Sequence, residues 1–429
     1  MKKTITATIL AAAMMFLSSC SGSNAQTTTK ASETAAVTQA ANTDETTAAP
    51  ETAEAAAEST EAQPPAEEER TASPVAANMK LLGRTLEQDG ILWLAHSASG
   101  VEFTFSGTKL TVDIKGDGAA VGSDPASQAR FAVFINGERT MDEIVDSAEK
   151  TYEIYTSDSD DEINVKLLKL SESANSAFGI EKFSFVGDYI TPVPEKALKI
   201  EFIGDSITCG YGVDDEVKEH HFSTQTEDAT KTYAYKAAEA LGADYSMVCY
   251  SGHGIISGYT DSGVKNELSL IPPIYEQFSK SYGSSKGYFD ETTPWDFEQF
   301  KPDYIVINLG TNDSSYVKTK ESRQEFIDES AKFIGQVRKC NPDAYIFWAL
   351  GTMGTNLNSS VKKAVEAYIG ETGDNRVSFI ALPQQNGDKN GYGADWHPTE
   401  ATHAEAAEKL VNEIKAILDA GSGEQTDAA

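Results

Sequence analysis

The chain has 429 residues, of which 40% are hydrophobic and 9% aromatic, so it can fold as two domains and bury a sizeable core. Its 66 acidic residues against 35 basic ones give a net charge of −31, and no stretch gathers Lys and Arg. This balance excludes a nucleic-acid-binding protein, because the phosphate backbone would repel such a surface.

Residues 1–19 have the pattern of a secretory signal peptide. Two lysines precede an apolar run that is shorter than a membrane span, and small residues lead into Cys20. The sequence Leu17-Ser18-Ser19-Cys20 resembles a bacterial lipobox, which implies cleavage before Cys20 and lipidation of its thiol. We therefore expect an exported, cell-surface lipoprotein that touches the bacterial membrane only through its lipid anchor. The alternative is an ordinary signal peptide with an incidental cysteine.

Residues 20–77 are expected to form a disordered linker rich in Ala, Thr and Glu. From Ser21 to Ala77 there is no aromatic, Leu, Ile or Met residue, and ten acids stand against two bases. Such a segment cannot bury enough apolar area to offset the entropy lost on folding. We therefore expect a spacer between the lipid anchor and the folded domains.

Residues 78–190 alternate between apolar and polar side chains, which is the period of β-strands. One stretch places three apolar side chains on a single face: Val101, Phe103 and Phe105. The pair Asn136-Gly137 is a tight-turn signal, and turn residues recur at short intervals. This pattern predicts an all-β sandwich domain.

Residues 197–420 follow a proline-marked joint and show apolar strands alternating with amphipathic helices. This order predicts a three-layer α/β/α domain with a parallel sheet, closed by a helix from Glu400 to about Leu418. Residues 421–429 are expected to be a flexible tail. In such sheets, ligands bind beyond the carboxyl ends of the strands.

The loops at those carboxyl ends hold the residue types that acyl transfer needs. Ser206 follows the first predicted strand, Gly252 the second and Asn312 the third, while His397 precedes the last helix. A serine hydroxyl becomes nucleophilic when a neighbouring base takes its proton, and the oxyanion that forms needs fixed donors. Ser206 lacks the Gly-x-Ser-x-Gly elbow, so for an isolated serine a helix N-cap would be the alternative.

Four blocks match those of the SGNH, or GDSL, hydrolases: Gly204-Asp205-Ser206, Gly252, Gly310-Thr311-Asn312-Asp313 and His397. From about Lys80 onward the chain also resembles carbohydrate esterase family 2, in stretches such as ILWLAHSASGVEFTFSGT, KIEFIGDSITCGYG, YSGHGI and DWHP. That family joins a jelly-roll β-sandwich to an SGNH domain and deacetylates plant polysaccharides.

The resemblance implies a role for each matched residue. Ser206 would be the nucleophile and His397 the general base. The backbone N–H groups of Ser206 and Gly252 and the side-chain amide of Asn312 would form the oxyanion hole, with Gly254 as the competing backbone donor. The reaction would pass through an acetyl-serine and would need no cofactor and no metal ion.

The group that orients His397 is left open by the sequence. The wider superfamily has an aspartate three residues before the histidine, where this chain has Ala394. Asp395 could reach the ring and complete a triad, or a backbone carbonyl could orient it and leave a Ser–His dyad. Trp396, beside the base, and His253, in the second loop, are the candidate substrate-binding residues.

We therefore expect a carboxylic ester hydrolase that removes acetyl groups from a plant polysaccharide, either xylan or glucomannan. The 6-O position is the one that the family resemblance favours. Two alternatives remain: an esterase of the same fold that acts on peptidoglycan or another small acyl ester, and a non-catalytic carbohydrate-binding lipoprotein. We expect a monomer. Cys209 and Cys249 are expected to be buried thiols, with a disulfide between them as the alternative.

Overall fold

The computed structural model describes residues 68–282 and 287–426, with side chains up to residue 419. The expectations for the signal peptide, for the lipidation of Cys20 and for most of the linker lie outside the described residues. So does the end of the expected tail, residues 427–429.

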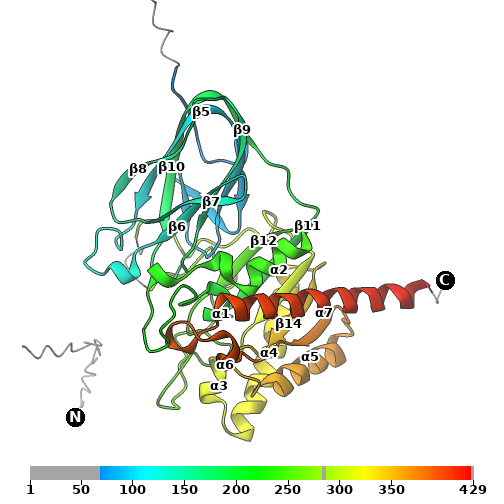
Figure 1. The fold of residues 1–429 in the computed structure, drawn as a ribbon. Coiled ribbons are helices and arrows are strands. Elements are labelled where there is room, and N and C mark those ends of the chain that lie inside the picture. The colour runs from blue at the N-terminus through cyan, green and yellow to red at the C-terminus, as the bar shows by residue number, and fades with distance from the viewer. Residues whose placement is uncertain (1–67, 283–286, 427–429) are drawn as a thin grey trace, which may run out of the picture. The chain divides into compact units, whose positions relative to one another are not determined.

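An antiparallel sheet of ten strands forms the first domain (Figure 1), which confirms the expected all-β fold. Its two longest strands, β5 (Gly100–Gly116) and β10 (Phe178–Pro192), pair along most of their length. The first half of β5 also pairs with β9 and its second half with β8, so the sheet can close around one core. The other strands are β1 (Arg70–Ala72), β2 (Lys80–Leu82), β3 (Thr85–Gln88), β4 (Ile91–Leu94), β6 (Arg130–Ile135), β7 (Glu138–Ile144), β8 (Glu149–Thr156) and β9 (Glu162–Lys169).

Hydrophobic alternation decides which face of β5 is buried. Val101, Phe103 and Phe105 are fully buried in the core of this domain, as the alternation predicts. The Asn136-Gly137 pair connects β6 and β7, and both residues have positive φ angles, 50° and 85°. Two consecutive left-handed residues form the turn whose twist suits a two-residue hairpin.

The folded region begins earlier than the expected linker boundary at residue 77. Strand β1 (Arg70–Ala72) pairs with β10 in antiparallel register, Thr71 lying opposite Ser184. The Arg70 guanidinium also donates to the carbonyl oxygen of Asp188 at 2.7 Å. Strand β1 is stabilised by backbone hydrogen bonds to β10, and the hydrophobicity of its own side chains does not predict these bonds.

A parallel five-stranded sheet forms the second domain, in the order β12-β11-β13-β14-β15. Two helices cover one face of this sheet, α2 (Tyr233–Leu241) and α7 (Glu400–Thr426), and two cover the other, α4 (Lys320–Cys340) and α5 (Asn358–Thr372). This arrangement confirms the predicted three-layer α/β/α fold (Figure 1). The strands are β11 (Leu198–Gly204), β12 (Ala243–Cys249), β13 (Tyr304–Asn308), β14 (Tyr345–Leu350) and β15 (Val377–Ala381); the short helices are α1 (Ser206–Cys209), α3 (Asp313–Tyr316) and α6 (Gly387–Asn390).

Helix α7 runs to Thr426, which is further than the expected end near Leu418 and reaches into the expected tail. Gly421 and Gly423 both lie within the helix. A glycine costs only about 1 kcal/mol in a helix interior, so it ends a helix only where the chain also turns away.

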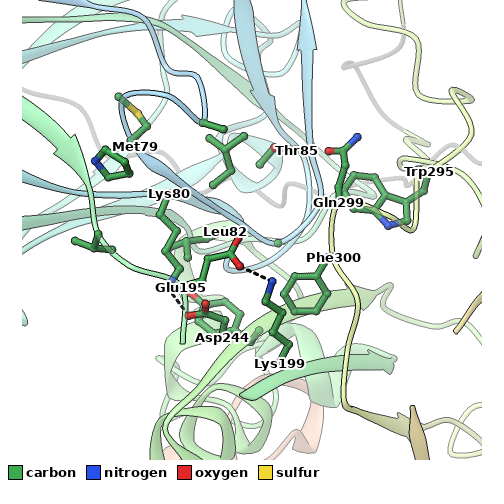
Figure 2. Close-up of a pocket in the computed structure, with 16 residues that line it drawn as sticks. Met79, Lys80, Leu82, Thr85, Glu195, Lys199, Asp244, Trp295, Gln299 and Phe300 are labelled. Atoms are coloured by element: carbon green, nitrogen blue, oxygen red, sulfur yellow. Dashed lines mark hydrogen bonds and ion pairs between the residues drawn. The ribbon is translucent and has the colours of Figure 1, made fainter. Parts of the chain in front are cut away.

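Buried ion pairs join the two domains. Arg84 of the β-domain lies 3.2 Å from Glu201 of β11, and Lys80 lies 2.5 Å from Asp244 of β12. A cavity of about 470 Å³ adjoins the Lys80 pair, and Figure 2 shows side chains of both domains around it, Trp295 and Phe300 among them.

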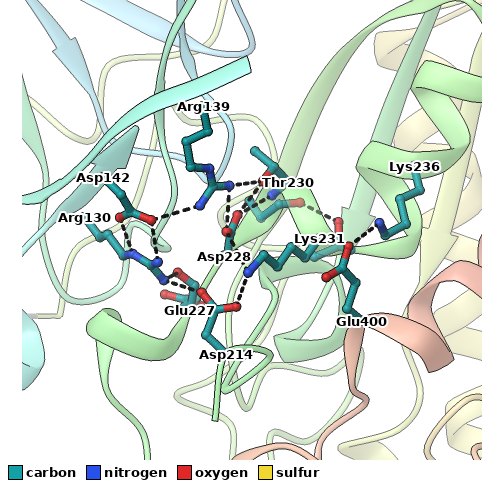
Figure 3. A network of polar contacts seen from close by, with 12 residues as sticks. Arg130, Arg139, Asp142, Asp214, Glu227, Asp228, Thr230, Lys231, Lys236 and Glu400 are labelled. Atoms are coloured by element: carbon teal, nitrogen blue, oxygen red, sulfur yellow. Dashed lines mark hydrogen bonds and ion pairs between the residues drawn. The ribbon is translucent and has the colours of Figure 1, made fainter. Parts of the chain in front are cut away.

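A second polar network joins the two domains (Figure 3). Arg130 of β6 pairs with Asp214 at 2.8 Å, and Arg139 of β7 pairs with Asp228 at 2.7 Å. Asp214 and Asp228 lie on the segment that connects α1 to α2. The β-domain therefore forms ion pairs both with strands β11 and β12 of the α/β domain and with the segment between α1 and α2.

Cys209 and Cys249 are buried free thiols, and no disulfide joins them. Among the described helices, none is both long enough and apolar enough to span a bilayer.

Candidate active site

The nucleophile candidate Ser206 is positioned by its own stretch of chain. Strand β11 ends at Gly204, and Asp205 caps helix α1 by accepting the N–H of Ile207 at 3.0 Å. Ser206 is the first residue of α1, so its N–H has no partner within the helix. A side chain at Gly204 would place its Cβ 2.0 Å from the Thr208 hydroxyl, so this tight turn requires glycine.

Ser206 and His397 are brought together although 191 positions separate them. Nε2 of His397 lies 2.8 Å from the Ser206 hydroxyl, and Nδ1 lies 3.1 Å from the carbonyl oxygen of Ala394. A nitrogen that faces a carbonyl must carry the ring hydrogen, so Nε2 is free to accept the serine proton. Burial lowers the pKa of His397 to about 4, which keeps the imidazole neutral at pH 7.

The Asp395 carboxylate makes no hydrogen bond to the His397 ring. Its carboxylate accepts the Tyr211 hydroxyl at 2.5 Å and Nδ1 of His221 at 2.9 Å. Asp395 and Trp396 both have left-handed φ angles, 47° and 58°, and the turn that they form leaves the Ala394 carbonyl facing the imidazole. The charge of Asp395 still acts at a distance, since it partly offsets the effect of burial by raising the pKa of His397.

Tyr211 packs against His397, a contact that the sequence did not predict. Its ring stacks on the His397 imidazole with centroids 4.0 Å apart and an interplanar angle of 20°. Burial and the bond to Asp395 raise the pKa of the Tyr211 phenol above its ordinary value, so it stays protonated and donates to the carboxylate. The only signal in the sequence was its place between two glycines directly after helix α1.

Backbone and side-chain donors line the same cavity as the Ser–His pair. Gly252 has a φ angle of 74°, and its N–H has no acceptor among the described residues. The Asn312 amide donates to the carbonyl oxygen of His253 at 2.8 Å and makes a longer contact of 3.3 Å with Asp205. Both hydrogens of the Asn312 amide thus have acceptors, and an oxyanion beside Ser206 would replace one of these two bonds. Gly254, the competing donor, gives its N–H to the Ser269 carbonyl at 3.1 Å.

Asp313 shapes the loop that carries Gly252. Its carboxylate accepts the backbone N–H groups of Ile255, Ile256 and Ser257 at 2.8–3.1 Å. Complete burial raises the pKa of Asp313 to about 6, although these bonds favour its charged form. A side chain at Gly254 would place its Cβ 2.5 Å from this carboxylate, so the loop needs glycine there.

The cavity above these groups has a volume of about 590 Å³. Trp396 and Tyr259 lie at its margin with 47% and 55% of their surface exposed. His253 does not line it: the ring is buried and bonds to the Ser251 carbonyl and the Tyr282 hydroxyl, each at 2.9 Å. The lining residues are Ser206, Tyr211, Ser251, Gly252, Tyr259, Asp261, Thr311, Asn312, Ser314, Ser315, Met353, Asp395, Trp396 and His397.

Two protein-family models match the chain. The model described as GDSL-like Lipase/Acylhydrolase matches residues 200–410. The model described as Carbohydrate esterase 2 N-terminal matches residues 81–194. The two matches cover the α/β domain and the β-domain in turn.

Several relatives match the chain over lengths that span both of its domains. The cellulase/esterase CelE of Acetivibrio thermocellus is 32% identical over 326 residues, which are 75% of this chain and 37% of that protein. The acetylxylan esterase/glucomannan deacetylase of Cellvibrio japonicus is 26% identical over 348 residues, covering 80% of this chain and 89% of that protein. The solved structure of a family two carbohydrate esterase from Clostridium thermocellum, in complex with cellohexaose, is 31% identical with a TM-score of 0.68; the match covers 80% of this chain and 99% of that one.

Proposed function

This chain belongs to carbohydrate esterase family 2, and from that premise we propose that it is a serine O-acetyl esterase acting on polysaccharides. The observation that carries the proposal is the hydrogen bond of 2.8 Å between the Ser206 hydroxyl and Nε2 of His397, whose other nitrogen is held by a backbone carbonyl. A serine in this position has a base ready to take its proton.

In the proposed reaction, the Ser206 oxygen attacks the acetyl carbonyl while its proton moves to Nε2 of His397. The tetrahedral intermediate carries its negative charge on the former carbonyl oxygen, between the N–H groups of Ser206 and Gly252 and the Asn312 amide. The C–O bond to the sugar then breaks, and His397 returns the proton to the leaving sugar oxygen. Water, deprotonated in turn by His397, attacks the carbonyl carbon of the acetyl-serine, and His397 returns that proton to the Ser206 oxygen as acetate leaves.

His397 acts as one half of a dyad in this proposal. The Ala394 carbonyl fixes the tautomer and the ring position, which is the role that a carboxylate fills in a triad. Asp395 stabilises the imidazolium through space and anchors Tyr211, whose ring covers one face of the imidazole.

The cavity supports a sugar ester as the substrate. Trp396 and Tyr259 offer exposed aromatic side chains at its margin, and most of the other lining residues carry hydroxyl, carboxylate, amide or imidazole groups. Aromatic faces stack on the apolar side of a sugar ring, and hydroxyl and carboxylate groups bind its hydroxyls. The name of the Cellvibrio japonicus relative makes acetylated xylan and glucomannan the first polymers to test.

The test is the release of acetate from acetylated xylan, acetylated glucomannan and O-acetylated peptidoglycan, each with a Ser206→Ala variant as the blank. The proposal expects release from at least one plant polymer that the Ser206→Ala variant does not catalyse. Release of acetate from peptidoglycan alone would show that the proposed substrate is wrong and that the proposed esterase reaction is right. No release from any acetyl ester would contradict the esterase function and leave a carbohydrate-binding protein.

A further inference from the structure

A buried carboxyl group of the β-domain touches the catalytic loops of the α/β domain. Glu172 lies in the loop between β9 and β10 and is 1% exposed. Its Oε2 accepts the backbone N–H of Ser251 at 2.6 Å, and the thiol of Cys209 lies 3.5 Å from the same oxygen. Ser251 directly precedes Gly252, and Cys209 ends the short helix that Ser206 begins.

We propose that Glu172 is a positioning residue of the active site, holding the oxyanion loop and the nucleophile helix in register across the domain boundary. The inference rests on the proposed function, since it assigns Gly252 and Ser206 their roles. Glu172 does not line the cavity and does not touch substrate. It acts by fixing where the Gly252 N–H points relative to the Ser206 hydroxyl.

The loop that carries Glu172 is itself held firmly. The Glu172 N–H donates to Oε2 of Glu227 at 2.8 Å. Oε1 of Glu172 accepts a hydrogen bond from the Asn175 amide at 3.3 Å. The Lys169 ammonium donates to the carbonyl oxygens of Ser171 and Glu172 at 2.6 and 3.0 Å. A residue held through its N–H, its carbonyl oxygen and its carboxyl group can act as a fixed support for a neighbouring loop.

Glu227 links this support to the second network between the domains. Its carbonyl oxygen accepts the Arg130 guanidinium at 3.2 Å, and Arg130 also pairs with Asp214 (Figure 3). Asp214 lies on the segment after α1 whose Gly212 carbonyl accepts the Ala394 N–H at 3.3 Å. The β-domain therefore reaches the oxyanion loop through Glu172 and the loop of the base through Arg130.

The chemistry of the site favours a hydrogen-bond support over a metal site. The donor atoms of Glu172, Cys209 and Glu227 lie within 4.8 Å of one another, as metal ligands would. Burial, however, raises the pKa of the Glu172 carboxyl and that of the Cys209 thiol, so both are held toward their protonated forms, and the nearby cation is Lys169. The Glu172 carboxyl is already occupied by the Ser251 N–H and Asn175.

Substitutions that keep or remove the acceptor test this inference. Glu172→Leu removes it, whereas Glu172→Gln keeps an oxygen at the same reach. We expect Glu172→Leu to lower kcat for a small acetyl ester by about 10- to 100-fold with KM within about twofold, because a donor displaced by about 1 Å loses transition-state contact and not substrate binding. Glu172→Gln should keep kcat within about threefold of the wild type.

The rate is measured per active site, counted by complete titration with an organophosphorus fluoride that labels the nucleophilic serine, and the melting temperature is recorded for each variant. Glu201→Gln is the matched control, since it weakens the pair with Arg84 across the same domain boundary without touching Ser251. We expect it to lower the melting temperature and leave kcat per titrated site unchanged.

The inference is overturned if Glu172→Leu keeps kcat per titrated site within twofold of the wild type, or if Glu201→Gln loses as much. If Glu172→Leu does not fold, Glu172→Asp decides: its carboxylate is one methylene too short for the Ser251 N–H, so the same loss per site is expected. A wild type that hydrolyses no acetyl ester would instead refute the proposed function, which separates the two failures.

Discussion

The two halves of the Ser206–His397 hydrogen bond reach their positions in different ways. Ser206 is set by the chain next to it: a strand ends, Asp205 caps a helix, and the serine is the first residue of that helix. His397 lies in a loop, and its ring is placed by Ser206, by the Ala394 carbonyl and by the stacked ring of Tyr211. The position of Ser206, the proposed nucleophile, is thus encoded locally, whereas the orientation of His397, the proposed base, is a tertiary property.

Removing the base should have the largest effect. We expect His397→Ala to lower kcat for a small acetyl ester by about 10⁴-fold or more, since the serine then lacks a proton acceptor. Steady-state kinetics on the folded variant, with its concentration taken from absorbance, measures the loss. Ser206→Ala should lose about as much, and the double variant no more than either single one. Losses that multiply in the double variant would mean that the two side chains do not act as a unit.

The oxyanion donors should come next. Asn312→Ala is expected to lower kcat by about 10²- to 10³-fold with little change in KM, because its amide binds charge that develops only in the transition state. Its melting temperature serves as the control, since the variant also loses the bond to the His253 carbonyl. A raised KM with an unchanged kcat would place Asn312 in substrate binding instead.

Two substitutions at Tyr211 separate the effect of its stacked ring on kcat from the effect of its hydroxyl group. Tyr211→Leu removes the ring that covers the imidazole and should lower kcat by about tenfold, since a stacked pair is worth about 0.5–1.5 kcal/mol. Tyr211→Phe keeps the ring and loses only the bond to Asp395, so its kcat should fall less. Equal losses in the two variants would assign the effect to the hydroxyl group, and the account of a base oriented by packing would need revision.

The sequence was sufficient for the elements that depend on periodicity and on loop position. The parallel sheet brings together Ser206, Gly252, Asn312 and His397 because each lies on a loop at the same edge. The features that the sequence did not predict depend on φ angles and on contacts between distant segments. The left-handed pair at Asp395 and Trp396 decides that a carbonyl and not a carboxylate meets the imidazole, and nothing in residue type alone specifies it.

The same limit explains two further differences. Glu172 lies in a loop of the β-domain, so no motif of the catalytic domain could point to its bond with Ser251. His253 was a candidate substrate-binding residue because it lies in the second loop, yet its ring is buried and bonds to the Tyr282 hydroxyl. Proximity along the chain located the loop, but it could not say which way each side chain faces.

The smallest expected effect tests the central claim, that a backbone carbonyl orients the base. Asp395→Asn should keep kcat at pH 7 within about tenfold of the wild type, because the carboxylate does not hold the ring. In the wild type, kcat/KM should fall as the pH drops through about 4, where His397 becomes protonated. The charge of Asp395 raises the pKa of His397, so Asp395→Asn should move that midpoint lower. A loss of about 10⁴-fold at pH 7 in Asp395→Asn would instead show that Asp395 acts as the acid of a triad.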